Sequence, residues 1–267
     1  MAKLAGIVIV ALAAFLVVHS VTAGVDKHGS RVVRFDVKSK FVGRTLHEVG
    51  VVPAGPPSDR PLLVFLHGRG QKPDDFFSAQ FFSGLAALDD RAPVVVALDG
   101  GDHSYWHDRR GGRWGSYVLR EALPEAIRRL GVDGSRVAIG GVSMGGFGAF
   151  DLARRHRFCA VGGHSPAFWL SAGSTAPGAF DDAADFSRHD VYAFARSRRR
   201  PFGSVPLWID RGDHDPFFSA DRALVRALRS DGSHVSSHVW PGAHTTAYWR
   251  SHTERYLRFY ADALERC

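Results

Sequence analysis

The stretch RVAIGGVSMGGFG, residues 136–148, decides the fold of this 267-residue chain. Its first residues form an apolar run typical of a buried strand, and residues 144–155 have the composition of a helix. Between them, Gly141-Val142-Ser143-Met144-Gly145 has the G-x-S-x-G pattern, which holds a serine on a sharp turn between a strand and a helix. A glycine-rich turn of a dinucleotide-binding sheet is the alternative, but the G-x-G-x-x-G pattern is absent here. We therefore predict that Ser143 is a nucleophile.

Apolar runs and amphipathic stretches alternate on both sides of this motif. The predicted strands are residues 32–37, 45–52, 62–66, 94–98, 137–139, 159–161, 207–209 and 235–240. The predicted helices are residues 75–88, 116–130, 144–155, 220–230 and 246–264, with a kink at Pro124 in the second. Because strands and helices alternate, we predict an α/β-hydrolase fold with a mostly parallel sheet, covered on both faces and preceded by antiparallel strands. Residues 172–200 are expected to form an irregular lid or cap.

The loops that follow the later strands supply candidates for the base and acid that a serine nucleophile needs. In the α/β-hydrolase chain order, the acid and then the histidine follow the serine. His244 comes directly after the strand that ends at Trp240, and we predict that it is the base. The acid is Asp213 or Asp215, because both follow the strand 207–209 and spacing alone does not separate them.

Two histidines compete for functional roles. His214 stands in the acid loop, where a neighbouring role is favoured over that of the base. His67 belongs to Leu66-His67-Gly68-Arg69-Gly70, a loop positioned to form half of an oxyanion hole. We predict that the backbone N–H groups of Arg69 and Met144 form that hole, and that His67 is structural.

At this point the chain resembles the esterase D-type family, which includes S-formylglutathione hydrolases, feruloyl esterases and the antigen 85 mycolyltransferases. The resemblance extends from about Leu62 to the C-terminus. The motifs that carry it are Phe65-Leu66-His67-Gly68, Asp99-Gly100-Gly101, Trp114-Gly115-Ser116-Tyr117-Val118, Gly141-Val142-Ser143-Met144-Gly145-Gly146, Ile209-Asp210-Arg211-Gly212, Asp215-Pro216-Phe217 and Gly242-Ala243-His244. The acid loop of the formylglutathione branch has the pattern D-x-G-x-x-D-x-F. The resemblance therefore implies that Asp215 is the acid.

The predicted activity is that of a serine esterase, which cleaves a carboxylic ester through an acyl-serine intermediate and requires no cofactor. The substrate would be a small-molecule or envelope-linked ester. Two alternatives remain open. One is an acyltransferase that moves the acyl group to an envelope sugar alcohol, and the other is a catalytically silent envelope-binding protein.

The N-terminal segment predicts export. Lys3 precedes an uncharged apolar run over residues 4–18, and Val21-Thr22-Ala23 has the small-x-small pattern of a cleavage site. The run also approaches the length of a membrane span. We predict that residues 1–28 are a signal peptide or signal anchor and that 29–267 form the catalytic domain, secreted or membrane-anchored outside the cytoplasm.

The net charge of the chain narrows the range of partners that it could bind. The formal net charge is +7, which suits an anionic envelope surface, and no nucleic-acid-binding motif accompanies it.

Cys159 lies in an apolar stretch and is predicted to be a small core residue rather than part of a disulfide. Around residues 102–108, aromatic and polar side chains are expected to line an acyl or sugar pocket. His103, His107, Asp213 and His214 have no metal-ligand spacing, so no metal is predicted.

Overall fold

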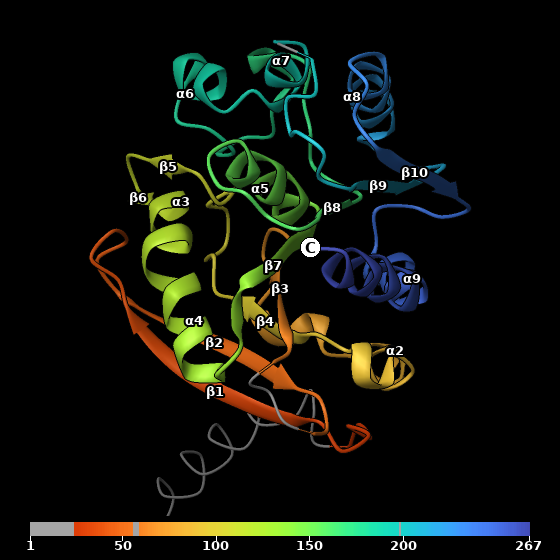
Figure 1. The fold of residues 1–267 in the computed structure, drawn as a ribbon. Helices are drawn as coiled ribbons and strands as arrows, with labels where there is room; N and C mark the ends of the chain where they lie inside the picture. Colours follow the sequence, from red (N-terminus) through yellow and green to blue (C-terminus); the bar gives the residue numbers. More distant parts are fainter. Residues whose placement is uncertain (1–23, 56–58, 198) are drawn as a thin grey trace, which may run out of the picture.

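An eight-stranded sheet organises the protein in the computed structural model, which describes residues 24–55, 59–197 and 199–267 (Figure 1). The strand order is β1–β2–β4–β3–β7–β8–β9–β10. The strands are β1 (Arg31–Lys38), β2 (Thr45–Val52), β3 (Pro61–Leu66), β4 (Val94–Leu98), β7 (Asp133–Val142), β8 (Val161–His164), β9 (Leu207–Gly212) and β10 (Val235–Trp240). A separate small hairpin joins β5 (Asp108–Arg109) to β6 (Gly112–Arg113).

The sheet is antiparallel at its N-terminal edge and parallel elsewhere, as predicted. β1 pairs with β2 and β2 with β4 in antiparallel register, whereas every pair from β4 to β10 is parallel. Parallel strands need crossover connections, and helices supply them here. The carboxyl ends of β3, β7, β9 and β10 therefore share one edge of the sheet, where ligands of open α/β sheets bind.

Helices cover both faces of the sheet (Figure 1). On one face lie α3 (Trp114–Tyr117), α4 (Leu123–Leu130), α5 (Met144–Ala153) and α8 (Phe218–Ser230), and on the other lie α2 (Ala79–Ala86) and α9 (Thr246–Glu265). Each face has its own apolar cluster, because alternate residues of the central strands point to opposite sides. Leu62 and Val64 of β3 join one cluster, and Leu63 and Phe65 join the other.

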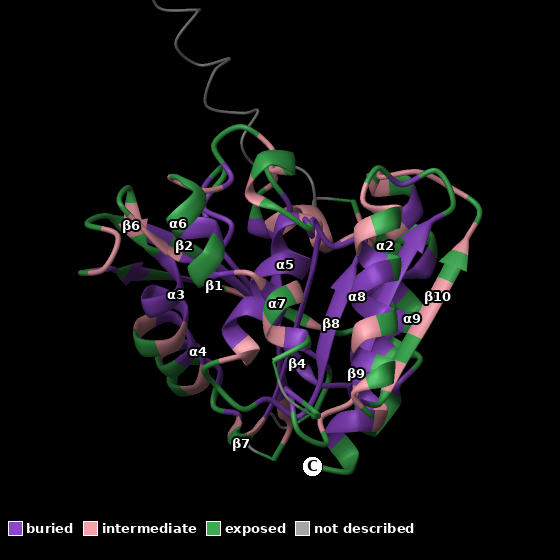
Figure 2. Cartoon of the chain, turned by 90° about the horizontal axis from the view of Figure 1, so that it is seen from above, coloured by how far each residue is buried: buried purple, intermediate pink, exposed green. Residues whose placement is uncertain are grey.

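Burial falls from the centre of the sheet to its edge (Figure 2). All five residues of β4 are buried, as are the last six of β7, which explains their continuous apolar runs. β10 is the edge strand, and its residues are intermediate or exposed. The sequence SHV within β10 is correspondingly more polar than the central strands.

Three predicted elements differ in detail from the structure. The helix expected at 75–88 begins as a short 3-10 turn, Pro73–Phe76, and its α-helical part is α2. The segment 116–130 is not one kinked helix, since a π-helical stretch, Val118–Ala122, joins α3 to α4 just before Pro124. A π-helical turn tolerates the missing proline N–H by changing the hydrogen-bond pattern. The segment 172–200 contains two short helices, α6 (Ala183–Arg188) and α7 (Val191–Ala195).

The prediction for Cys159 was half wrong. Its side chain is buried as expected, but it forms a disulfide with Cys267 across 108 residues of sequence. The error arose because the cysteines lie so far apart in the chain that no local spacing reveals the pair. The bond fastens the end of α9 beside β8, so the last helix is covalently attached to the sheet.

Most of the predicted leader, residues 1–28, lies outside the described residues. Among the helices that the structure does describe, none combines the length and apolar character needed to cross a bilayer. Export of the chain therefore stays a prediction.

Candidate active site

Ser143 lies on the turn between β7 and α5, as its motif predicts. Its backbone has φ 53° and ψ −116°, a left-handed conformation that side chains rarely adopt. The turn is fixed on both sides, since the Ser143 N–H donates to the His164 carbonyl at 3.0 Å and its own carbonyl accepts from the N–H of Ala167 at 3.0 Å. This bent geometry separates the Ser143 side chain from both the sheet and the helix.

The glycines of the motif are required by close packing against β3. A Cβ on Gly145 would lie 1.9 Å from the Leu66 carbonyl oxygen, and one on Gly141 would lie 2.4 Å from the same atom. Neither position can hold a side chain without moving backbone. The loop after β3 therefore lies directly against the serine turn, and a Cβ on Gly68 would be 3.4 Å from the Cβ of Ser143.

His244 connects Ser143 to Asp215. The Nε2 atom of His244 lies 2.8 Å from the Ser143 Oγ, and its Nδ1 lies 3.0 Å from Asp215 Oδ2. Because a carboxylate only accepts hydrogen bonds, Nδ1 carries the imidazole proton and Nε2 is free to accept the serine proton. The other oxygen of Asp215 accepts the N–H of Phe217 at 2.8 Å, which fixes the carboxylate.

The electrostatics of Asp215 favour its ionised form. Burial by itself would raise the pKa of Asp215, but the hydrogen bond and charge of His244, together with the Phe217 N–H, lower it below the ordinary value. The Asp215 side chain is 0% exposed, whereas the His244 side chain is 21% exposed. The histidine therefore lies between a buried acid and the open side of the site.

Asp213 and His214 do not join this chain of hydrogen bonds. The Asp213 carboxylate accepts the Gly242 N–H at 2.9 Å, which holds the acid loop against the loop that bears His244. The His214 side chain is 83% exposed and lies 4.0 Å from Asp213. Of the two acids that spacing left open, the structure brings only Asp215 to His244.

His67 supports the loop that contains Arg69. Its Nε2 accepts the Gly100 N–H at 2.9 Å, so its proton is on Nδ1, which donates to the Gly68 carbonyl at 2.8 Å. Burial lowers the pKa of His67, which keeps the ring neutral. Both nitrogens are therefore occupied by backbone groups. Gln71 adds a further contact, since its side-chain oxygen accepts the Gly68 N–H at 2.8 Å.

A buried network behind the site was not predicted. Asp210 of β9 accepts hydrogen bonds from His164 Nδ1 and Trp208 Nε1, both at 2.7 Å. It also accepts from the hydroxyls of Tyr248 at 3.0 Å and Tyr256 at 2.9 Å. The sequence showed Asp210 only as the first residue of the acid-loop pattern. Tyr248 and Tyr256 are eight residues apart and therefore lie on the same face of α9. Two tyrosines on one face of a predicted helix were the signal that could have revealed this network.

Trp249 is a second residue that the sequence analysis missed. Its indole packs edge-on against His244, with ring centroids 5.1 Å apart, and it lies on the first turn of α9. Phe217 contacts His244 from another direction at 5.2 Å. These aromatic rings limit the rotation of the imidazole. Trp249 follows His244 by five residues, at the start of the last predicted helix. This position was the signal that could have indicated a contact between the two side chains.

Of residues 102–108, which were expected to line a pocket, Asp102, His103 and Ser104 line a cleft of about 540 Å³, whereas the aromatic side chains of Tyr105 and Trp106 are buried in the core. The residues that line this cleft include Arg44, Lys72, Asp102, His103, Ser104 and Trp114. The four residues considered and rejected as a metal site do not meet. His103 lines this cleft and His214 is at the surface, while His107 is buried and bonded to Asp185.

Comparisons with known proteins agree on the kind of fold and family. The model of the family described as "Putative esterase" matches residues 49–259. A curated esterase of Mycobacterium tuberculosis is 30% identical over 222 residues, which cover 69% of this chain and 48% of the relative. The chain thus spans about half the length of the curated relatives it matches.

Solved structures support the same fold. A ferulic acid esterase superposes with a TM-score of 0.76 at 22% identity, covering 88% of this chain and 98% of that one. S-formylglutathione hydrolase from Agrobacterium tumefaciens gives a TM-score of 0.71 at 18% identity, covering 89% of this chain and 96% of that one. Both belong to branches named in the resemblance, and at these identities they establish the fold alone.

Proposed function

Because the chain belongs to the esterase family, we propose that it hydrolyses a carboxylic ester through an acyl intermediate on Ser143. The observation that carries this proposal is the continuous hydrogen-bonded chain from Ser143 through His244 to Asp215, with contacts of 2.8 and 3.0 Å. A nucleophile, a base and an orienting acid in this order are the parts that acyl transfer needs.

In the first half of the reaction, His244 Nε2 takes the proton of the Ser143 hydroxyl as Oγ attacks the ester carbonyl. The resulting imidazolium is stabilised by Asp215, which remains ionised. His244 then gives its proton to the departing alcohol oxygen as the C–O bond of the ester breaks. The acyl group is left on Ser143 as a new ester.

Stabilisation of the tetrahedral intermediate is assigned to backbone N–H groups. Met144 begins α5 directly after Ser143, so its N–H belongs to the helix N-terminus, where negative charge is favoured. The second donor is the N–H of Arg69, in the loop that His67 and Gln71 hold against the serine turn. Two donors on different segments would converge on the oxyanion.

In the second half, His244 activates the molecule that attacks the acyl-serine. Water gives hydrolysis, and a sugar hydroxyl would give acyl transfer, which is the second candidate function. The polar cleft lined by Arg44, Asp102 and Ser104 borders the loop that contains Arg69, because the Gly70 N–H donates to the Asp102 carbonyl at 2.9 Å, and it would suit an alcohol portion that carries hydroxyl groups. Adding a sugar acceptor and analysing the products by mass spectrometry separates the two, because only transfer forms an acylated sugar.

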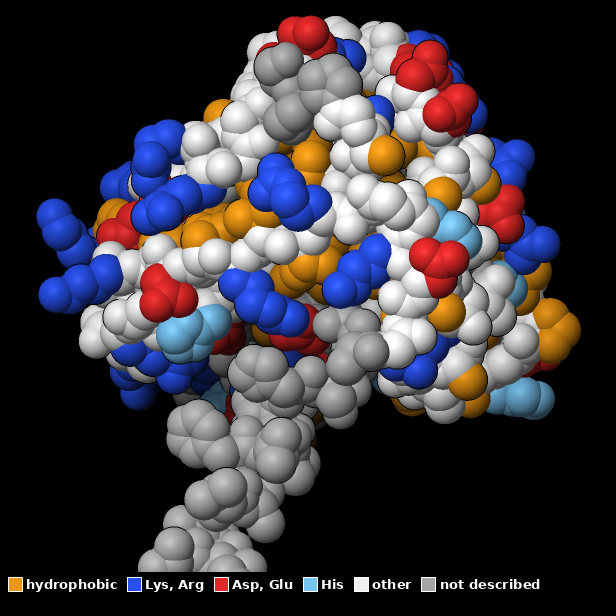
Figure 3. Space-filling view, turned by 90° about the horizontal axis from the view of Figure 1, so that it is seen from below, with side chains coloured by type: hydrophobic (Ala, Val, Ile, Leu, Met, Phe, Trp, Pro, Cys, Tyr) orange, Lys and Arg blue, Asp and Glu red, His pale blue; other side chains and the backbone are white. Residues whose placement is uncertain are grey.

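We also propose that the protein acts outside the cytoplasm on an anionic envelope surface. The Cys159–Cys267 disulfide suits an oxidising compartment, and the N-terminal run over residues 4–18 suits export. Lys and Arg side chains are spread over the face in Figure 3, with acidic side chains between them. Attraction to an anionic surface would therefore be diffuse and would weaken as salt rises.

The test of the catalytic proposal is the variant Ser143→Ala. It should fold like the wild type and hydrolyse p-nitrophenyl acetate at least about 10³-fold more slowly, because the attacking atom is missing. A fluorophosphonate probe should label the wild type once, at Ser143, and leave the variant unlabelled. Turnover of the variant near the wild-type rate would refute the mechanism.

A further inference from the structure

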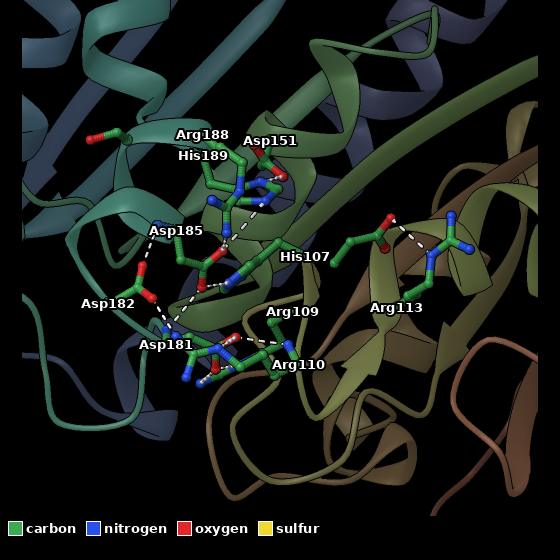
Figure 4. Close-up of polar contacts among 12 residues, drawn as sticks. His107, Arg109, Arg110, Arg113, Asp151, Asp181, Asp182, Asp185, Arg188 and His189 are labelled. Carbon is green, nitrogen blue, oxygen red and sulfur yellow. Dashed lines mark hydrogen bonds and ion pairs between the residues drawn. The ribbon is translucent and has the colours of Figure 1, made fainter.

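A second cluster of reactive side chains lies away from the proposed catalytic residues. His107, Asp185 and His189 meet in the interior, with side-chain exposures of 0%, 0% and 7% (Figure 4). They come from three places: His107 from the segment after β4, Asp185 from α6, and His189 from the connection between α6 and α7. The proposed reaction uses none of them.

The atoms of this cluster are spaced like metal ligands. Asp185 Oδ2 lies 3.1 Å from His107 Nε2, and Oδ1 lies 3.9 Å from His189 Nε2. One ligand atom from each of the three residues lies within 4.8 Å of the others. A tetrahedral ion with bonds of about 2.0–2.1 Å holds its ligand atoms roughly 3.3 Å apart. Shifts of about an ångström would bring the three atoms to that spacing.

The hydrogen bonds of His189 direct a lone pair toward Asp185. Its Nδ1 lies 2.8 Å from Asp151 Oδ2, so the ring proton is on Nδ1 and Nε2 is unprotonated in the neutral ring. The unprotonated Nε2 lies 3.9 Å from Oδ1 of Asp185, another acceptor, which also accepts from Arg188 at 3.0 Å, and a cation between Nε2 and Oδ1 would interact with both. A carboxylate on the far nitrogen of a ligating histidine is also the common second partner in metal sites. Asp151 occupies that position.

His107 differs from His189, because its Nε2 lies 3.1 Å from Asp185 Oδ2 and therefore carries the ring proton, which would have to move to Nδ1 before Nε2 could bind a cation. Burial lowers its pKa to about 3, with the neighbouring His189 as a further cause, so the ring is neutral over the ordinary pH range. Its Nδ1 is buried with no partner among the described residues. A neutral imidazole inside a protein, with one nitrogen on a carboxylate and the other unbonded, is poorly satisfied as it stands.

Of the two carboxylates, Asp151 and Asp185, Asp185 has less positive charge beside it. Asp151, near the end of α5, is paired with Arg154 at 2.8 Å and Arg155 at 3.3 Å, which follow directly after the helix. Among the described residues, the arginine paired with Asp185 is Arg188 at 3.0 Å, whose side chain is 60% exposed and therefore solvated, and the Asp181 N–H also donates to the carboxylate at 2.9 Å. A buried cation beside Asp185 would have a full negative charge to interact with.

We propose that His107, Asp185 and His189 bind a divalent zinc ion. Two imidazoles and a carboxylate are ligands that zinc prefers, and Asp185 or a water molecule would supply the fourth position. The ion would join the segment 183–195 to the segment after β4, and through Asp151 to α5, which begins beside Ser143. Its role would be structural, clamping the cap onto the helix that bears the nucleophile. Sequence spacing predicted no metal because 78 residues separate His107 from Asp185.

The first experiment uses the full chain and zinc alone. After treatment with a chelator and removal of free metal, the protein is titrated with Zn²⁺, and bound zinc is measured by mass spectrometry. We expect one equivalent per chain and a rise in melting temperature of about 5–10 °C at free zinc a hundredfold above Kd. A wild-type protein that retains no zinc and shows no thermal shift would overturn the proposal.

Matched variants locate the ion. His107→Gln and His189→Gln should lose the bound equivalent and the thermal shift. His103→Gln, four residues earlier in the same segment, should keep both. Ser143→Ala should also keep both, so that zinc binding is tested independently of esterase activity. One full equivalent of zinc in both glutamine variants of the cluster would place the metal elsewhere and refute this site.

Cobalt provides a measurement that does not depend on the variants folding. Co²⁺ in a tetrahedral site of nitrogen and oxygen ligands has intense visible absorption, whereas octahedral Co²⁺ at the surface absorbs weakly. The wild-type protein loaded with one equivalent should show the intense bands, and added Zn²⁺ should remove them. Only weak octahedral absorption would contradict the proposal.

Discussion

At the scale of single residues, the site depends on positions where one atom more would not fit. Ser143 is held at positive φ, and Gly141 and Gly145 lie against the Leu66 carbonyl with no room for a Cβ. The G-x-S-x-G pattern therefore reflects the close packing of this turn as well as the chemistry of its serine. This is why Ser143 could be singled out from sequence, since a strained turn admits few residue types.

The two acids of one loop should differ sharply in their effect on rate. Asp215→Asn should lower kcat by up to about 10⁴, because an amide at this position stabilises the wrong tautomer of His244. Asp213→Asn is the matched control. It weakens only a loop contact with the Gly242 N–H and should cost about tenfold or less. Hydrolysis of p-nitrophenyl acetate by both folded variants measures the ranking, and the reverse order would move the acid to Asp213.

A buried carboxyl on β2 should make stability depend on pH. Burial raises the pKa of Glu48 from 4.5 to about 8, even though Tyr117 and the Asp99 N–H donate hydrogen bonds to it. The folded state therefore holds this proton more tightly than the unfolded chain. Its stabilisation is complete below pH 4.5 and is lost as pH rises toward 8, by up to about 4 kcal/mol.

The variant Glu48→Gln tests this expectation, because glutamine has the same shape and does not ionise. Its free energy of unfolding should change less between pH 5 and 8 than that of the wild type. Urea denaturation at several pH values measures the difference. Equal pH dependence of the two proteins would mean that Glu48 ionises as readily in the folded state as in the unfolded one.

At the scale of elements, the start of α9 holds the loop that bears His244. Tyr248, near the start of the helix, donates to Asp210, and its ring would lie 2.8 Å from a Cβ on Gly242, in the loop that bears His244. Thr245 caps the same helix, because its hydroxyl accepts the Tyr248 N–H at 3.3 Å. The histidine thus enters the site from a loop whose far end is anchored in the core.

Removing the Tyr248 hydroxyl should loosen that anchor. Tyr248→Phe removes one hydrogen bond to a buried carboxylate and should lower the free energy of unfolding by about 1–3 kcal/mol. It should also reduce kcat more than it changes KM, since the role proposed for His244 belongs to the chemical step. Tyr192→Phe, on the half-buried α7, is the control and should change neither quantity much. A Tyr248→Phe enzyme with wild-type kcat would show that the anchor does not reach His244.

Features that depend on residues close together in the sequence could be predicted, whereas features that join distant segments of the chain could not. The strands and helices around Ser143, and the candidate roles of Ser143 and His244, follow from local periodicity and chain order. The choice of Asp215 over Asp213 came from the family resemblance. The Asp210 network and the group of His107, Asp185 and His189 were missed, because their members come from separate elements and share no local motif. The segment 172–200 was expected to be irregular for a related reason, since its short helices are stabilised by packing against α5 rather than by their own periodicity.

At the scale of the whole molecule, the Cys159–Cys267 disulfide should add substantially to stability. It closes a loop of 108 residues, and such a cross-link lowers the entropy of the unfolded chain. Cys267→Ser should therefore lower the free energy of unfolding by about 2–4 kcal/mol. Denaturation of the oxidised wild type and the variant measures the difference. A wild type that loses no stability on mild reduction would contradict it.

The same covalent loop determines what happens to this protein when a protease cuts it. Arg196 and Arg199 are exposed in the connection after α7, where trypsin can reach them. A cut there divides the chain between Ser143 on one fragment and Asp215 and His244 on the other. The fragments stay joined through Cys159 and Cys267, so the nicked protein should migrate as one band in non-reducing gels and as two after reduction. Such a protein can lose the continuity of its backbone while Ser143, Asp215 and His244 stay in one covalently linked molecule.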